Sequence, residues 1–323
     1  MTRLGYQIPN FDYPGVAKAD IFRVTAASAA AAEEAGFDTV LVMDHFYQLP
    51  GLGAPDNSML ECYTLLGALA QHTSRVRLGA LVTGNTYRNP AILAKCISTL
   101  DHASGGRAQL GIGTGWFELE HDAFGIEFGT FTDRFAKLEE ALQIILPMLR
   151  GERPSFTGDH YTAKDAINEP APLSEIPVMI GGSGERKTLR MVAQYATLGN
   201  LTCGPDEVPR KIEALAGHCD RLGRDRAEIT LSWHRAVCIG ETTAEAEADR
   251  DAFLSTRGLD YANLPAEIQT IIDAALVVGD ADTIGQTFTE WKALGVDGFT
   301  VSMPAQGHRP EMVALAGRVL GAI

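Results

Sequence analysis

The sequence predicts a (β/α)8 TIM barrel with insertions, formed by a single domain over residues 1–323. Short apolar runs alternate with helical stretches along the whole chain, which is typical of parallel strands joined by crossover helices. The alternation gives eight strand–helix units, as in a (β/α)8 barrel. A hydrophobic share of 46% over 323 residues is enough for a full core. A doubly wound sheet is the competing arrangement.

The strands are predicted from apolar runs short enough to be buried strands. They are residues 4–8, 39–43, 76–82, 107–112, 177–180, 198–202, 229–239 and 298–301. The helices are predicted from helical spacing and from end signals such as a first-turn proline or a terminal glycine. They are residues 20–36, 59–71, 90–103, 131–149, 185–195, 205–222, 242–273 with a break at 258–265, 283–294 and 310–320. Residues 154–168 are predicted to form a hairpin excursion, and residues 50–57, 83–89 and 114–130 to form loops.

The overall charge and the cysteines restrict the class of protein. A net charge of −14 argues against nucleic acid and anionic membranes as partners. The five cysteines are odd in number and contain no CxxC pair, so we expect reduced thiols in a cytoplasmic protein. No apolar run approaches membrane-spanning length. No HExxH, Walker or zinc-finger spacing occurs, so no metal site is predicted.

The active site of a barrel lies where its strands hand over to the following helices. Asp44 and His45 follow the second predicted strand at such a handover. Histidine suits proton transfer near neutral pH, and the neighbouring carboxylate either binds a cofactor ring or orients the histidine. The alternative is a polar pair that caps the following loop.

Two glycine-rich turns, at residues 109–116 and 176–186, also fall at handovers. Successive amides in such turns make anion-binding concavities, and a helix start after the second turn adds free N–H groups. Arg186, Lys187 and Arg190 would supply local positive charge. The pair of turns therefore predicts a phosphorylated cofactor, although each turn alone is also an ordinary strand-to-helix connection. A Rossmann site is excluded because Trp116 stands where the third glycine would fall.

Three further side chains are ambiguous. Trp116 is either a pocket wall or a core aromatic residue. His121 lies in the predicted loop beside Glu118 and Glu120 and is expected to be an exposed histidine. His234, near the end of the seventh strand, either lines the pocket or packs in the core or at its rim.

Nearly the whole chain resembles the bacterial luciferase-like barrel family, and within it the deazaflavin-dependent oxidoreductases. The resemblance is carried by residues 42–46, 76–90, 105–121 and 179–190. It implies coenzyme F420, an 8-hydroxy-5-deazaflavin, or alternatively FMN, bound at the barrel mouth. It also implies a bulge at the third strand with a non-prolyl cis peptide at Leu81–Val82, behind the ring.

The resemblance implies particular site residues and partners. The implied cofactor contacts are Asp44, Leu81, Val82, Thr83, Asn85, Gly113, Thr114, Gly115, Gly181, Gly182, Ser183 and Gly184. Phe46, Tyr47 and Trp116 are expected to line the substrate pocket and exclude water. The implied partners are a small-molecule substrate, a second copy of the chain in a homodimer, and a flavin or F420 reductase that supplies reduced cofactor.

One position departs from the family pattern. Sugar-phosphate dehydrogenases of the family have a glutamate proton donor where this chain has Trp116, which argues against sugar-phosphate oxidation and leaves His45 as the catalytic candidate. We therefore expect an oxidoreductase that transfers a hydride between F420 and a small organic substrate. The alternatives are an FMN-dependent two-component monooxygenase and a non-catalytic flavin-binding barrel.

Overall fold

The computed structural model describes residues 3–323. Its strands are β1 (Arg3–Ile8), β2 (Thr39–Val42), β3 (Arg77–Ala80), β4 (Thr83–Gly84), β5 (Ala108–Gly113), β6 (Phe156–Thr157), β7 (Thr162–Ala163), β8 (Val178–Gly181), β9 (Leu198–Leu201), β10 (Thr230–Gly240), β11 (Leu276–Asp280) and β12 (Gly298–Ser302). Its α-helices are α1 (Ile21–Glu34), α2 (Cys62–Leu69), α3 (Pro90–Ser104), α4 (Glu118–Phe124), α5 (Phe131–Leu149), α6 (Thr188–Tyr195), α7 (Val208–Leu222), α8 (Thr243–Ser255), α9 (Ala266–Ala275), α10 (Ala281–Lys292) and α11 (Pro310–Gly321).

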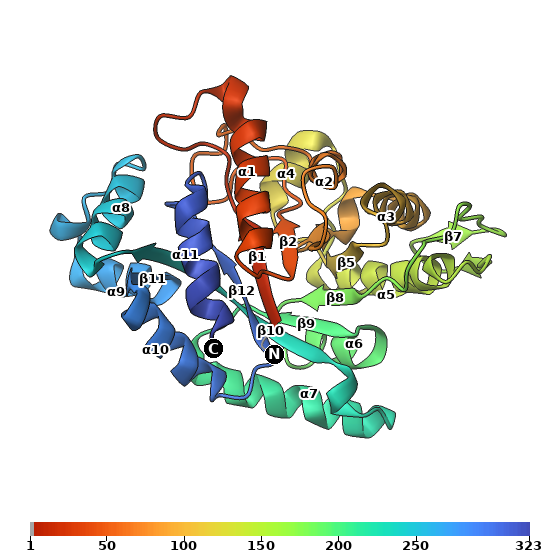
Figure 1. Cartoon of the computed structure of the whole chain (residues 1–323). Helices are drawn as coiled ribbons and strands as arrows, with labels where there is room; N and C mark the ends of the chain where they lie inside the picture. The colour runs from red at the N-terminus through yellow and green to blue at the C-terminus, as the bar shows by residue number, and fades with distance from the viewer. Residues whose placement is uncertain (1–2) are drawn as a thin grey trace.

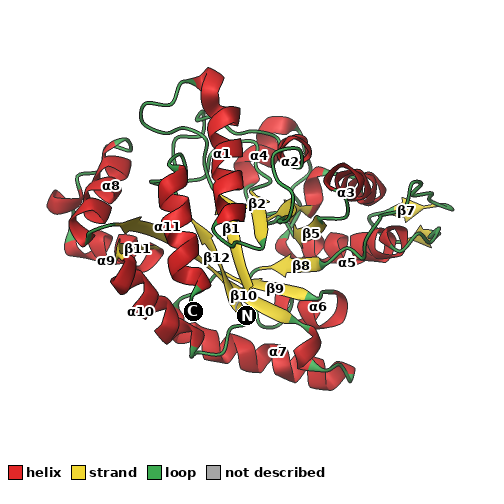
Figure 2. Ribbon diagram, viewed as in Figure 1, coloured by secondary structure: helices red, strands yellow, loops and turns green. Residues whose placement is uncertain are grey.

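Eight parallel strands close into a barrel within residues 3–323. Their order is β10-β12-β1-β2-β3-β5-β8-β9, and β9 pairs back onto β10. The helices form a layer outside the strands (Figures 1 and 2). The predicted (β/α)8 barrel is therefore confirmed, and the doubly wound alternative is excluded. In this described part of the chain, no helix has the length and apolar character needed to cross a bilayer.

Local sequence signals account for several helix boundaries. Helix α3 begins with Pro90, after Asn89 accepts a hydrogen bond from a first-turn amide, and it ends at Gly105 with a left-handed φ of 67°. Helix α5 begins with a reciprocal capping box between Thr130 and Asp133. The predicted hairpin is also present, as the antiparallel pair β6 and β7 at the edge of the molecule (Figure 1).

Three elements differ from the prediction. The predicted third strand stops at Ala80, and the chain then rejoins the sheet as β4, which pairs with β5. Strand β11 was not predicted, and it extends the sheet beyond the barrel by pairing with the second half of the long strand β10. Part of the predicted loop at 114–130 is helix α4, whose seven residues include two buried side chains, Glu120 and His121.

Candidate active site

The carboxyl ends of the barrel strands surround a cavity of about 1190 Å³. This is the end at which barrel active sites form. Most of the residues predicted for the site line this cavity. They are Asp44, His45, Leu81, Val82, Thr83, Gly113, Thr114, Gly115, Trp116, Gly181, Gly182 and Gly184. Segments separated by more than a hundred residues of sequence therefore meet at one site.

The wall formed by the third strand is built around a bulge. The Leu81–Val82 peptide bond is cis, as predicted. The carbonyl oxygen of Leu81 accepts a hydrogen bond of 3.3 Å from the side chain of Gln7 on β1. The bulge thus lies in the cavity wall between β2 and β5, and its backbone is bonded to a side chain of β1, two strands away in the barrel.

The side chain of Val82 explains why glycines occupy two neighbouring strands. A Cβ atom at Gly113 would lie 2.9 Å from a Val82 methyl group, and one at Gly181 would lie 2.8 Å from the other methyl group. A Cβ at Gly111 would lie only 2.0 Å from the carbonyl oxygen of Ala80. These glycines are therefore required by strand packing, whether or not a phosphate binds nearby.

The second glycine turn carries the positive charge of the cavity. Arg186 and Lys187 line the cavity, immediately before helix α6 begins at Thr188. The Lys187 ammonium group lies 5.1 Å from the ring centroids of both Phe131 and Phe135. Arg190, the third predicted cation, instead pairs with Glu139 at 2.8 Å and does not line the cavity.

Gly182 has a φ of 118°, a conformation that side-chain-bearing residues rarely adopt. Its amide donates a 2.9 Å hydrogen bond to the carbonyl oxygen of Asn200 on β9. A valine at this position would therefore strain the turn itself.

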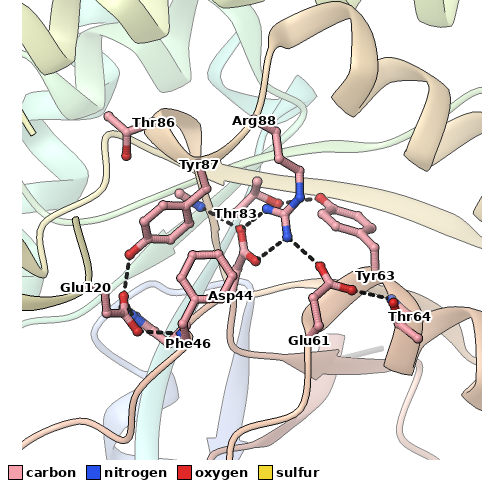
Figure 3. Close-up of polar contacts among 12 residues, drawn as sticks. Asp44, Phe46, Glu61, Tyr63, Thr64, Thr83, Thr86, Tyr87, Arg88 and Glu120 are labelled. Atoms are coloured by element: carbon pink, nitrogen blue, oxygen red, sulfur yellow. Dashed lines mark hydrogen bonds and ion pairs between the residues drawn. The ribbon is translucent and has the colours of Figure 1, made fainter. Parts of the chain in front are cut away.

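Asp44 is held in a buried network rather than left free in the cavity. Its carboxylate accepts bonds of 2.6 and 2.9 Å from Arg88 and one of 3.1 Å from the amide of Gly84 (Figure 3). Arg88 also donates to Glu61 at 2.6 Å. Burial lowers the pKa of Arg88, but the hydrogen bonds that it donates to Asp44 outweigh burial and raise that pKa well above its usual value. Burial raises the pKa of Asp44, and the bonds from Arg88 oppose that shift. Arg88 is therefore charged, and Asp44 anchors the segment that follows the bulge.

His45 is paired with a buried carboxylate from helix α4. Its Nδ1 lies 2.9 Å from Oε2 of Glu120, whose side chain is fully buried. The other oxygen of Glu120 accepts bonds from the amides of Phe46 and Tyr47, and Tyr87 donates its hydroxyl to Oε2 (Figure 3). Because a carboxylate only accepts, Nδ1 of His45 carries the proton and Nε2 is unprotonated in the neutral ring.

The hydrogen bonds to Glu120 also fix its charge. Burial raises the pKa of Glu120, but the bonds from His45 and from the Tyr47 amide outweigh burial and lower that pKa below its usual value. Glu120 was noted in the sequence only as a neighbour of His121, and it lies 75 residues from His45. Only the packing of α4 against the segment after β2 brings the two side chains together.

His121 is fully buried, so the prediction of an exposed loop histidine is wrong. Its Nδ1 donates to the carbonyl oxygen of Phe117 at 2.8 Å, which leaves Nε2 to accept from the hydroxyl of Thr86 at 2.7 Å. Both nitrogens are thus used internally. His121 ties helix α4 to the short 3-10 helix Asn85–Tyr87 and does not face the cavity.

Trp116 stands at the mouth of the cavity with 58% of its surface exposed. Its ring lies 5.7 Å from that of His45 in an edge-on arrangement. Trp116 is therefore a wall residue and not a core aromatic.

The side chains of Phe46 and Tyr47 do not line the cavity. Both instead contact the ring of Phe124 at the end of α4, with centroids 4.7 and 5.7 Å away.

Asn85 and Ser183 also lie outside the cavity wall. Asn85 is buried, and its Nδ2 has no hydrogen-bond partner within residues 3–323. The hydroxyl of Ser183 accepts a 2.8 Å bond from the amide of Thr202. Both residues therefore lie directly behind the wall, next to neighbours that do line it.

The cavity floor contains two polar atoms that have no partner in the described protein. They are Nε2 of His234 on β10 and Oδ1 of Asn200 on β9. Burial, together with the charge of Arg235, lowers the pKa of His234 to about 4, so the ring is neutral near pH 7. Of the two readings of His234, pocket lining is the one that the structure supports.

The model of the family described as luciferase-like monooxygenase matches residues 2–298. The F420-dependent glucose-6-phosphate dehydrogenase of Microbacterium testaceum (strain StLB037) is 34% identical over 215 residues, which are 63% of this chain and 62% of that protein. That of Segniliparus rotundus (strain ATCC BAA-972) is 37% identical over 170 residues, 51% of this chain and 48% of the relative. The chain thus spans about half to three fifths of the curated relatives it matches.

Two solved structures share the fold across almost the entire chain. The coenzyme F420-dependent tetrahydromethanopterin reductase of Methanopyrus kandleri has a TM-score of 0.77 at 20% identity, covering 99% of both chains. An F420-dependent secondary alcohol dehydrogenase, solved with an F420-acetone adduct, has a TM-score of 0.80 at 19% identity, covering 99% of this chain and 98% of the other.

Proposed function

Because this chain belongs to the luciferase-like monooxygenase family, we propose that it is an oxidoreductase that transfers a hydride between coenzyme F420 and a small organic substrate. The observation that carries this proposal is the pairing of His45 with buried Glu120 at the edge of a large cavity. The names of the curated relatives, which are F420-dependent dehydrogenases, support the choice of cofactor.

The residues of the cavity fit a phosphorylated, ring-containing cofactor. A volume of about 1190 Å³ exceeds what a small substrate alone requires. Arg186 and Lys187 provide positive charge at one end, in a chain whose net charge is −14. The unpartnered Oδ1 of Asn200 offers an acceptor at the floor. A buried acceptor without a partner is costly, so a bound group that donates to it is favoured.

We assign the ring and the phosphate of the cofactor to different parts of the cavity wall. Leu81, Val82 and Thr83 would lie behind the ring, on the side opposite the substrate. The amides of residues 113–115 and of Gly184, with Lys187, would hold the phosphate, because the Gly182 amide is already bonded to Asn200. Asp44 would act through Arg88 and the Gly84 amide, by holding the segment after the bulge in place. Asn85 and Ser183 would support the wall from behind.

When bound, F420 supplies a two-electron hydride acceptor or donor. His45 would move the accompanying proton. In alcohol oxidation, Nε2 of His45 would take the hydroxyl proton. The carbon that bears this hydroxyl would give up its hydride to the acceptor that F420 supplies and become a carbonyl carbon. Glu120 would hold the imidazole in the required tautomer and stabilise its positive charge. Trp116 would limit the access of water to the reacting carbon.

Cofactor titration tests this proposal. Purified protein is titrated with F420 and with FMN, and binding is followed by the fluorescence of each cofactor. We expect F420 to bind clearly more tightly, and turnover to proceed without oxygen consumption. Tighter binding of FMN with oxygen uptake would favour the two-component monooxygenase, which receives reduced flavin from a reductase. Binding of F420 without turnover of any substrate would favour a non-catalytic barrel.

We further propose a homodimer in a reducing, cytoplasmic setting, with an F420 reductase to regenerate the cofactor. The family resemblance supports the dimer, and the cysteines support the setting, since all five are free thiols. Light scattering of the purified chain tests the dimer, because a monomer mass would refute it. Fractionation of cells tests the location of the protein.

A further inference from the structure

We propose that the substrate is an uncharged, mainly apolar molecule that carries a single carbonyl or hydroxyl oxygen at its reacting carbon. This inference rests on the proposed function and narrows its substrate class. It comes from the composition of one half of the cavity, the half formed at the ends of β10, β12, β1 and β2, which are neighbours in the barrel. Apart from Asp44, which follows β2, and Asn200 on β9, the cofactor residues assigned above lie on β3, β5 and β8 and on the turns that follow them.

The free half of the cavity has mainly apolar walls. Pro9 follows β1, Leu49 and Leu52 lie in the loop after β2, and Ala236 projects from β10. These side chains offer no hydrogen bonds to a substrate. A polyol placed against them would lose water from several hydroxyl groups without gaining partners, which is unfavourable for each group. An alkyl chain would gain from the same contacts.

The charge of the cavity is equally one-sided. Among described lining residues, the only arginine or lysine side chains are Arg186 and Lys187, and both follow β8. Arg257 lies near the free half but does not line it, and its guanidinium group donates to the carbonyl oxygens of Phe253 and Leu52. A phosphate or carboxylate on the substrate would therefore meet no counter-ion in this half of a strongly acidic protein.

The few polar groups in this half suit one oxygen atom. They are Gln7, Asp44, His45, His234 and Ser302, of which Gln7 already donates to the carbonyl oxygen of Leu81 and Asp44 is bonded to Arg88. Nε2 of His234 is buried without a partner and is therefore available for one hydrogen bond. The His234 ring is neutral, so it adds no positive charge to attract an anion. One carbonyl or hydroxyl oxygen near His45 would use the free hydrogen-bonding capacity of His45, His234 and Ser302. No polar group in this half would then remain for a second oxygen.

The known relatives do not settle this point, because their names cite chemically different substrates, a sugar phosphate, a pterin and a secondary alcohol. The cavity distinguishes among these chemistries. A sugar phosphate would bring both several hydroxyl groups and a phosphate dianion into the apolar half. The inferred substrate class therefore differs from the sugar phosphate that the names of the curated relatives cite.

Ligand binding to the F420-loaded protein tests the inference. The neutral probes are 2-butanone, 2-pentanone and 2-hexanone, and the charged probes are 5-oxohexanoate and glucose 6-phosphate. The first charged probe is 2-hexanone with a carboxylate in place of the methyl group at its far end. Dissociation constants are measured by calorimetry, so the readout does not require turnover. We expect the constant to fall about fourfold for each added methylene, and 5-oxohexanoate to bind at least about tenfold more weakly than 2-hexanone.

Two variants show whether this half of the cavity is responsible. Leu49→Ala removes part of the apolar wall and should weaken 2-hexanone more than 2-butanone. Leu173→Ala removes an exposed leucine outside the cavity and should change neither constant. Retained F420 binding shows that each variant is folded.

The outcomes separate this inference from the proposed function. A protein that fails to bind F420 overturns both. A loaded protein that binds glucose 6-phosphate or 5-oxohexanoate as tightly as 2-hexanone overturns only the substrate class. If the dissociation constant depends on the length of the ketone in the same way in the wild type and in Leu49→Ala, that result also overturns the assignment of this half of the cavity to the substrate.

Discussion

Substituting Glu120 with glutamine tests whether this residue makes His45 a base. The amide oxygen of glutamine can still accept from the amides of Phe46 and Tyr47, so the turn after β2 keeps its contacts. The amide nitrogen then replaces Oε2, which lies 2.9 Å from Nδ1 of His45. Because that nitrogen is a donor, Nδ1 must become the acceptor and Nε2 must carry the proton. The imidazole is then in the wrong tautomer to take a proton from substrate.

The size of the effect follows from this change of tautomer. General base catalysis typically contributes ~10²–10⁴-fold, so hydride transfer from an alcohol should slow by about that factor. This corresponds to about 3–5 kcal/mol of activation free energy. The variant also loses charge-assisted hydrogen bonds from His45 and Tyr87, each worth ~1.5–3 kcal/mol, so its stability should fall as well. The affinity for F420 should change little, because Glu120 does not line the cavity.

Single-turnover hydride transfer, followed by the loss of deazaflavin fluorescence, measures the rate. Urea unfolding of the same preparation measures stability. Glu118→Gln is the matched control, since Glu118 is an exposed residue on the same helix. His45→Ala should lose a similar factor, and combining it with Glu120→Gln should add almost nothing, because residues that act as a unit are not additive. A Glu120→Gln rate close to that of the wild type would refute the assignment.

Three other substitutions test separate parts of the account. Lys187→Ala should weaken F420 binding by about 10–100-fold, because a charge-assisted bond to the phosphate is lost. Arg190→Ala is the control and should leave the affinity for F420 unchanged. Equal effects of the two substitutions in the titration would contradict the assignment of Lys187 to the phosphate. Arg88→Ala should lower the free energy of unfolding by about 3–5 kcal/mol, because Asp44 would stay buried without its partner. A loss below about 1 kcal/mol, measured by urea unfolding, would show that the fold does not depend on the ion pair. His234 has a folded-state pKa of about 4, against an ordinary value of 6.5, because burial disfavours its charged form. The free energy of unfolding of the wild type should therefore fall by ~2–3 kcal/mol as the pH is lowered from above 6.5 toward 4. The His234→Gln variant should lack this loss, and an unchanged pH profile would refute the assignment to His234.

The sequence was sufficient for the barrel because its strands are buried on both faces. Buried parallel strands appear as continuous apolar runs, and residues 39–43 and 177–180 are clear examples. Strand β11 was missed because its five residues pair only with the overhanging half of β10, outside the barrel. The cis bond at Leu81–Val82 came from family resemblance and not from any local signal.

The site was only partly predictable. Asp44 and His45 were found because they follow a buried strand, but the partners that define their roles are distant in sequence. Arg88 is 44 residues from Asp44, and Glu120 is 75 residues from His45. No spacing rule links such residues, since their contact depends on how loops after different strands pack together. The glycine turns show a different limit, because Gly113 and Gly181 are already required by the side chain of Val82.

A crystal structure of the chain with F420 tests the central claim most directly. We predict that the deazaflavin ring lies against Leu81–Val82 and that the phosphate contacts the amides of residues 113–115 or of Gly184. The reacting ring carbon should face the side of the cavity that holds His45. A ring bound away from the Leu81–Val82 bulge, or one that presents its reacting carbon to the wall opposite His45, would contradict it.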